Sequence, residues 1–215
     1  MLKHDSIRRA KTAMKFALHN QHEENLGLRV KGLVTFDMRD ARTGEVLCYW
    51  QKDNIVLLDA GILTARLYKD NAEPPHGINM LAVGTGALGA ILNPDAPPVE
   101  QRRLNNEIER KAFDSTTFRD SSGAAVSIPT NVVNFTTIFN QSEAVGPLNE
   151  MGLMSTISDN PTVTNPNPNF AGQGGQPYDP TIDVTLYDMQ VNYLTFEVIS
   201  KPATAVLAVT WRLSF

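Results

Sequence analysis

Cysteine and long apolar runs are scarce in this chain of 215 residues. Its single cysteine, Cys48, excludes an internal disulfide and any zinc site built from several cysteines. No apolar stretch approaches the length that spans a bilayer, so we expect no membrane partner. The basic residues near the start are not followed by the apolar region of a secretory signal. These absences favour a protein made in a cytoplasm.

Familiar catalytic motifs are also missing. We find no G-x-S-x-G elbow, no H-E-x-x-H pair and no P-loop lysine. The four histidines offer at most the pair His19 and His22, with no third metal ligand in view. Cys48 has no base near it in the sequence, and its spacing with Trp50 predicts a small core residue. We therefore expect no catalytic, cofactor-binding or metal-binding residues.

Charge is unevenly distributed along the chain. The net charge of −4 gives no overall attraction to nucleic acid or anionic lipid, yet residues 1–19 contain five basic residues and one acidic residue. Apolar residues recur at helical spacing there, which predicts a basic amphipathic helix. Two interpretations stay open: a helix packed on its own domain, or an arm (residues 1–24) that docks on an acidic partner. We favour the arm, with these docking residues: Arg8, Arg9, Lys11 and Lys15.

From residue 25 onward the pattern is mostly that of strands. Residues 28–51 alternate in polarity around a turn ending at Gly44, which predicts a β-hairpin. Residues 54–69 have helical spacing, with Asp53 or Asn54 as the cap. A short strand is expected over 78–83.

The second half contains further strands and one long irregular loop. Residues 131–140 are rich in β-branched and aromatic side chains, and 189–200 with 204–215 form a second hairpin candidate around Lys201-Pro-Ala. Loop 159–182 is rich in proline and glycine; it either lies across a neighbouring subunit or is a plain surface loop. We expect a mainly β protein: an antiparallel, jelly-roll-like β-sandwich over 25–215, with one internal helix and an N-terminal helical arm.

The glycines Gly84, Gly86 and Gly89 have the G-x-G-x-x-G spacing of dinucleotide-binding proteins. That motif requires a parallel strand before it and a helix after it, whose N-terminus holds the phosphates. Pro94 follows too soon for a long helix, and Glu107, at the spacing of the ribose-binding acid, lies in a stretch too charged for a buried parallel strand. We expect the glycines to provide backbone freedom where a strand enters a loop. A nucleotide-binding enzyme remains a remote alternative.

Several short motifs occur in an order that resembles one protein family. They are LAVGTG at 81–86, Leu104-x-x-Glu107-x-x-Arg110, EAVGPLNEMGLM at 143–154 and the closing strand AVLAVTWRLSF. The order resembles tailed-bacteriophage virion proteins, in particular the N-terminal attachment region of tail-collar fibre proteins. The residues NIVLLDAGILTARLYKD, which come before these motifs, resemble a helix of the same family.

The resemblance implies a structural role for the motif residues. Gly84 and Gly86 would form a turn, Glu107, Arg110 and Glu150 would form an internal salt-bridge network, and Gly152 belongs to the third motif. The long loop, the basic helix in front and the lack of a fibre part behind depart from the family and favour an adaptor, collar or decoration protein over a host-recognition protein.

We therefore expect a non-enzymatic component of a tailed-phage virion, assembled in the host cytoplasm. Tail, collar or baseplate adaptor and fibre-attachment roles come first, and a capsid decoration (cement) protein is the alternative. The expected partners are tail, portal, fibre or capsid subunits and further copies of the chain, but not nucleic acid or a membrane.

Overall fold

Strands dominate the structure, a computed structural model that describes residues 30–69, 77–101, 103–156 and 188–215. Of these residues 58% are in strands and 8% are helical, and the sheets are antiparallel. The expected mainly β class with one internal helix is therefore confirmed for this part of the chain. The proposed arm (1–24, with Arg8, Arg9, Lys11 and Lys15) and loop 159–182 lie outside the described residues.

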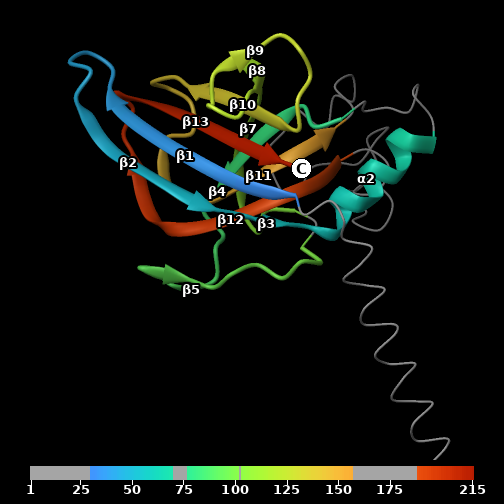
Figure 1. Ribbon diagram of the computed structural model, residues 1–215. Coiled ribbons are helices and arrows are strands. Elements are labelled where there is room, and N and C mark those ends of the chain that lie inside the picture. Colours follow the sequence, from blue (N-terminus) through green and yellow to red (C-terminus); the bar gives the residue numbers. More distant parts are fainter. Residues whose placement is uncertain (1–29, 70–76, 102, 157–187) are drawn as a thin grey trace, which may run out of the picture.

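Two sheets contain most of the strands (Figure 1). The six-stranded sheet has the spatial order β2 (Val46–Asp53), β1 (Lys31–Asp40), β13 (Ala205–Ser214), β10 (Val132–Phe139), β8 (Ser115–Arg119) and β9 (Ala125–Val126). The five-stranded sheet has the order β3 (Ile55–Val56), β12 (Asp188–Lys201), β11 (Gly146–Thr156), β4 (Met80–Gly84) and β7 (Glu107–Ala112). The helix α2 (Leu58–Lys69) follows β3, and β5 (Gly89–Ala90) pairs with β6 (Asn93–Pro94) in a small hairpin.

Both sheets contribute side chains to one main core. In β1 every second residue is buried, and β13 alternates in the same way, because successive side chains of a strand point to opposite faces. Phe36 of β1 and Trp211 of β13 lie in the same buried cluster as Met151 and Leu153 of β11. Phe36 also stacks on Trp50 with ring centroids 5.0 Å apart. Cys48 is partly buried against this cluster, as a core residue would be.

The first hairpin forms as expected, while the next element differs at its start. β1 and β2 pair over the predicted region. The helix begins at Leu58 and not at Asn54, because Ile55 and Val56 pair with Tyr193 and Asn192 of β12 and form β3. No helix within the described residues is long and apolar enough to cross a membrane.

The expected second hairpin is wrong. β12 and β13 follow each other closely in the sequence, but β12 belongs to the five-stranded sheet and β13 to the six-stranded sheet. β13 pairs instead with β1 and β10. The chain crosses from one sheet to the other at Pro202, so the two strands reach the common core from opposite sides.

Candidate functional site

The motif residues meet on three neighbouring strands of the five-stranded sheet. β4 lies between β11 and β7; Gly84 pairs with Glu150 on one side and with Glu107 on the other. Two residues earlier on β4, Ala82 pairs with Gly152 on one side and with Arg110 on the other. Stretches up to 70 positions apart in the sequence are thus brought together by the strand order.

These residues lie on the face of the sheet that is turned away from the main core. Met151 and Leu153 of β11 point into that core, so Glu150 and Gly152 point the other way. A second, smaller cluster covers this face, with Leu104 packed against Ala82 and Tyr193. Leu104 belongs to the segment that follows β4, described for residues 85–101 and 103–106, which we call the covering segment.

Glu150 fastens the covering segment to the sheet. Its side chain is fully buried, and its Oε1 accepts hydrogen bonds from the backbone N–H groups of Gly86 and Asn106, both at 2.8 Å. Its Oε2 accepts from the backbone N–H of Asn105 at 3.0 Å and from the hydroxyl of Tyr193. A carboxylate has about four acceptor positions, so these four donors satisfy it. We call these five residues the Glu150 clasp.

Gly84 and Gly86 are needed because the backbone and the carboxylate approach so closely. A Cβ on Gly84 would lie 2.5 Å from the carbonyl oxygen of Asn106 and 2.6 Å from Oε1 of Glu150. One on Gly86 would lie 2.4 Å from the backbone nitrogen of Asn106. Of the three motif glycines only Gly89 has a positive φ, 90°. The expected backbone freedom therefore applies to Gly89, and close packing explains the other two.

The dinucleotide-binding geometry does not occur at this motif. β4 runs antiparallel to both of its neighbours, and Gly89 begins β5 instead of a helix. The N–H of Gly86, placed to meet a phosphate in that motif, binds the carboxylate of Glu150. Here the oriented N–H groups hold an anion that the chain itself supplies.

Glu107 and Arg110 form a separate ion pair on β7. Their side chains are only 5% and 3% exposed, and Arg110 donates to both carboxylate oxygens of Glu107: Nε to Oε1, and Nη2 to Oε2 at 2.6 Å. The resemblance implied a single network with Glu150. In the structure Glu150 is held by backbone N–H groups and Tyr193, whereas Glu107 is held by Arg110.

Tyr193 is the member of the clasp that the sequence did not single out. Burial, followed by the charge of Glu150, raises the pKa of its hydroxyl above the usual value, so the phenol stays protonated and donates. Asn105 and Asn106 were also missed because they act through backbone N–H groups, which leave no trace in side-chain type. Gly152 provides room on the same face, since a Cβ there would lie 2.8 Å from both the carbonyl oxygen of Asn192 and Nε2 of Gln190.

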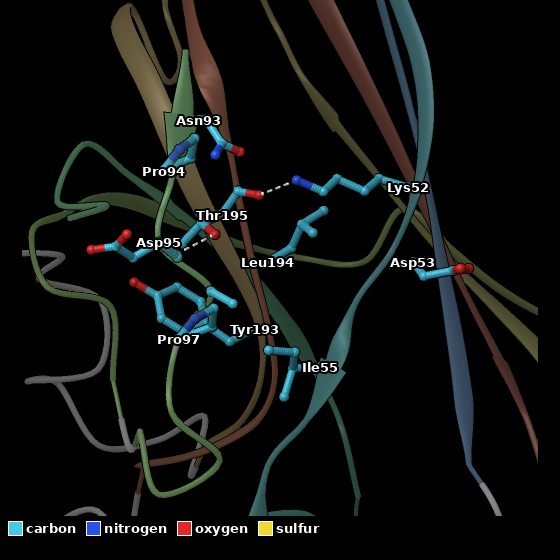
Figure 2. Close-up of a pocket in the computed structure, with 11 residues that line it drawn as sticks. Lys52, Asp53, Ile55, Asn93, Pro94, Asp95, Pro97, Tyr193, Leu194 and Thr195 are labelled. Atoms are coloured by element: carbon cyan, nitrogen blue, oxygen red, sulfur yellow. Dashed lines mark hydrogen bonds between the residues drawn. The ribbon is translucent and has the colours of Figure 1, made fainter. Parts of the chain in front are cut away.

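A pocket of about 390 Å³ adjoins the clasp where β2, β3 and β12 meet the Asn93–Pro97 stretch (Figure 2). Lys52 reaches across from β2, and its Nζ donates to the carbonyl oxygen of Thr195 at 3.0 Å. The hydroxyl of Thr195 donates to the carbonyl oxygen of Asp95 at 2.9 Å. Since Tyr193 lines this pocket and also binds Glu150, the clasp forms part of its wall.

A further polar cluster fixes the turn between β10 and β11, where the chain passes from one sheet to the other. Lys111 of β7 binds Glu143 at 2.7 Å, and the fully buried Lys201 donates from Nζ to the carbonyl oxygen of Asn140 at 2.7 Å. Burial lowers the pKa of Lys201, an effect that the charges of Glu109 and Glu143 oppose. Both lysines therefore anchor the turn.

The described residues support a structural interpretation of the motif positions. Each oxygen of Glu150 is occupied by donors of the chain, and Glu107 is paired with Arg110. No group of three or more metal-binding side chains occurs among the residues that the structure describes. No protein-family model matches the chain, and no curated protein is significantly similar to it.

Proposed function

We propose that the chain is a non-enzymatic structural component of a tailed-phage virion. Its most suitable place is a tail, collar or baseplate adaptor or a fibre-attachment protein that works in several copies. The observation that carries this proposal is the convergence of three separate motifs of the resemblance on one face of one sheet.

The fold that accompanies this proposal is a β-sandwich with an N-terminal helical arm. Two sheets that share a core agree with such a sandwich. The jelly-roll-like connection and the helical arm stay predictions.

The clasp has a mechanical role in this proposal, because it fixes the base of a projecting hairpin. The covering segment contains β5 and β6, and its apolar side chains Leu88, Ile91 and Leu92 are 67%, 71% and 74% exposed. The N–H of Asp95 closes the hairpin on the carbonyl oxygen of Leu88 at 2.7 Å. Exposed apolar groups gathered on one projection are typical of a docking surface. Repetition in a symmetric particle makes modest contacts sufficient.

Purified particles test the virion proposal directly. Mass spectrometry of particles of the phage that encodes the chain should detect it in stoichiometric amounts, and electron microscopy should place it at the tail or collar. Density on the shell would instead identify a capsid decoration protein. Absence from the particles would refute both placements.

The hairpin gives a sharper test within the same system. Replacing Leu92 by Asp should reduce incorporation into particles at least tenfold and leave the melting temperature unchanged, because the side chain is exposed. Ile128→Asp is the matched control, since Ile128 is also 74% exposed but lies outside the hairpin. Equal losses for both variants would contradict docking through the hairpin.

The remote alternative, a nucleotide-binding enzyme, is tested with the isolated protein. A ligand that binds only the folded state raises the melting temperature. NAD, NADP and ATP at millimolar concentration should leave it unchanged, and a clear rise with any of them would overturn the structural role.

A further inference from the structure

The outer edge of β2 is open in the described structure. β2 is the last strand of the six-stranded sheet and pairs along one edge with β1 (Figure 1). None of the other described strands pairs with its second edge. Such an edge presents a row of backbone N–H and C=O groups to any strand that can align with it.

Edge strands are commonly protected by proline, charged side chains or short length, and β2 has little of this protection. It is eight residues long, and the stretch from Val46 to Gln51 contains neither proline nor a charged residue. Its lysine, Lys52, donates a hydrogen bond to the carbonyl oxygen of Thr195 on β12 of the other sheet. Lys52 and the exposed Asp53 both lie at the C-terminal end of β2, so the rest of the edge is without charge.

The exposed side chains in the first half of β2 are apolar, and the exposed polar residues Gln51, Lys52 and Asp53 follow at its end. Val46, Leu47 and Tyr49 are 48%, 44% and 56% exposed. On the opposite face of the strand, Cys48 and Trp50 pack on the main core, and the stack of Trp50 on Phe36 holds the strand in place. The edge is therefore a preformed template whose outer residues gain from being covered.

The sequence of β2 is complementary to itself in one antiparallel register. Two antiparallel strands that continue one sheet are related by a two-fold axis perpendicular to it, so facing residues point to the same side. When the two-fold axis passes midway between the two Cys48 residues, Leu47 of each copy faces Tyr49 of the other. Glu45 then faces Gln51, which can donate a hydrogen bond to it. Cys48 faces its own counterpart.

Neighbouring registers bring unfavourable pairs together. With the axis at Tyr49, Glu45 faces Asp53 in both halves, and like charges directly opposite each other are destabilising. With the axis at Trp50, Leu47 faces Asp53 and loses its apolar contact.

In the remaining neighbouring register, with the axis at Leu47, residues 49–53 face the turn at 41–45, so only Val46, Leu47 and Cys48 of each strand can pair. We propose that β2 pairs with β2 of a second copy of this chain, with Cys48 opposite Cys48, so that the two six-stranded sheets form one continuous sheet. This dimer does not depend on the virion role and is testable in solution.

The dimer is measured with the full-length protein by light scattering after size-exclusion chromatography, from about 1 to about 300 µM, the range of weak to moderate interfaces. The average mass should rise with concentration toward that of a dimer. Tyr49→Lys adds a charge at the edge of both copies and should raise the dissociation constant at least tenfold. Ile128→Lys, which changes an exposed apolar residue outside both β2 and the projecting hairpin, should leave it unchanged.

Oxidation of Cys48 tests the register. Directly opposite residues of an antiparallel pair have Cα atoms about 4.5–5.5 Å apart, within the range that a disulfide spans. Burial and the charge of Glu197 raise the pKa of the Cys48 thiol, so the oxidation is run at about pH 9. A disulfide-linked dimer should form and be lost in both Cys48→Ser and Tyr49→Lys.

Three results would overturn the inference. The first is a protein that stays monomeric over the whole concentration range. The second is a dimer that Tyr49→Lys leaves intact or that Ile128→Lys weakens equally. The third is a dimer that does not cross-link through Cys48, because the proposed register would then be wrong.

Discussion

The buried carboxylate of Glu150 can stabilise the fold only because hydrogen-bond donors surround it. Removing a carboxylate from water is costly unless hydrogen bonds replace the lost hydration. Three backbone N–H groups and the Tyr193 hydroxyl do so here. Because three of the four donors belong to the backbone of the covering segment, folding of that segment and burial of the charge occur together.

Replacing Glu150 by Gln should lower the free energy of unfolding by about 2–3 kcal/mol. The amide would turn an N–H donor toward the N–H of Asn105, which would lose its acceptor. Urea denaturation at neutral pH measures the change. Glu100→Gln is the matched control at an exposed position and should stay within about 0.5 kcal/mol. Equal stability of the two variants would show that the clasp is not a stabilising feature.

Tyr193 gives the stability an alkaline limit. Its pKa is raised in the folded state, so above about pH 10 the unfolded chain loses this proton while the folded chain keeps it. The unfolded state then binds fewer protons, and stability falls by up to about 1.4 kcal/mol per pH unit. In Tyr193→Phe this contribution disappears.

Urea denaturation of both proteins at pH 8, 10 and 11 tests this expectation. The stability difference between wild type and Tyr193→Phe should shrink as the pH rises. Cys48 and Lys201 also have shifted pKa values, but they titrate in both proteins and cancel in the comparison. A difference that does not change with pH would contradict a protonated, buried Tyr193.

At the scale of elements, two glycines in different surroundings should respond to alanine in opposite directions. Gly86→Ala places a methyl group 2.4 Å from the backbone nitrogen of Asn106 and should cost about 3 kcal/mol. Gly61 lies within α2 with nothing within 4 Å of its would-be Cβ, so Gly61→Ala should stabilise by about 0.5–1 kcal/mol. Thermal unfolding of both variants measures the contrast. A loss of stability well below this value in Gly86→Ala would mean that the covering segment shifts at little cost to make room for the methyl group.

Elements with a clear pattern of apolar and polar residues within their own stretch of sequence could be predicted. The β1–β2 hairpin has clear alternation on both sides of its own turn, and β10 is rich in β-branched and aromatic residues. β7 could not be predicted because four of its six residues are charged. In the structure those charges find partners outside the strand or along it, such as Glu143 for Lys111, and the strand lies at a sheet edge.

Pairing between distant strands explains the remaining errors. The short Lys201-Pro-Ala connection has the length of a hairpin loop, and only the pairing of β13 with β1 and β10 shows that it joins two sheets. In the same way, Ile55 has helical spacing with Leu58 but is held in β3 by β12. For the clasp, the sequence analysis singled out Glu150 and Gly86 and missed Tyr193, Asn105 and Asn106.

At the scale of the whole molecule, opposite charges are separated along the chain. The net charge is −4, although residues 1–19 have an excess of basic residues, so the remainder is distinctly acidic. That separation allows the predicted arm two roles: docking on an acidic surface of a partner protein, or folding back on its own domain. The two differ in whether the basic side chains contribute to the stability of the isolated protein.

Reversing Arg8, Arg9, Lys11 and Lys15 to Glu separates these roles. For a docking arm, the melting temperature of the isolated protein should stay almost unchanged, since exposed charges away from caps and cores alter stability by only about 0.5 kcal/mol. Incorporation into particles should fall. Binding by the unmodified protein should weaken with salt, because exposed charges are screened beyond about 10 Å at 0.1 M ionic strength. A lower melting temperature of the reversed variant would instead mean that the arm stabilises its own acidic domain, and docking through these residues would be refuted.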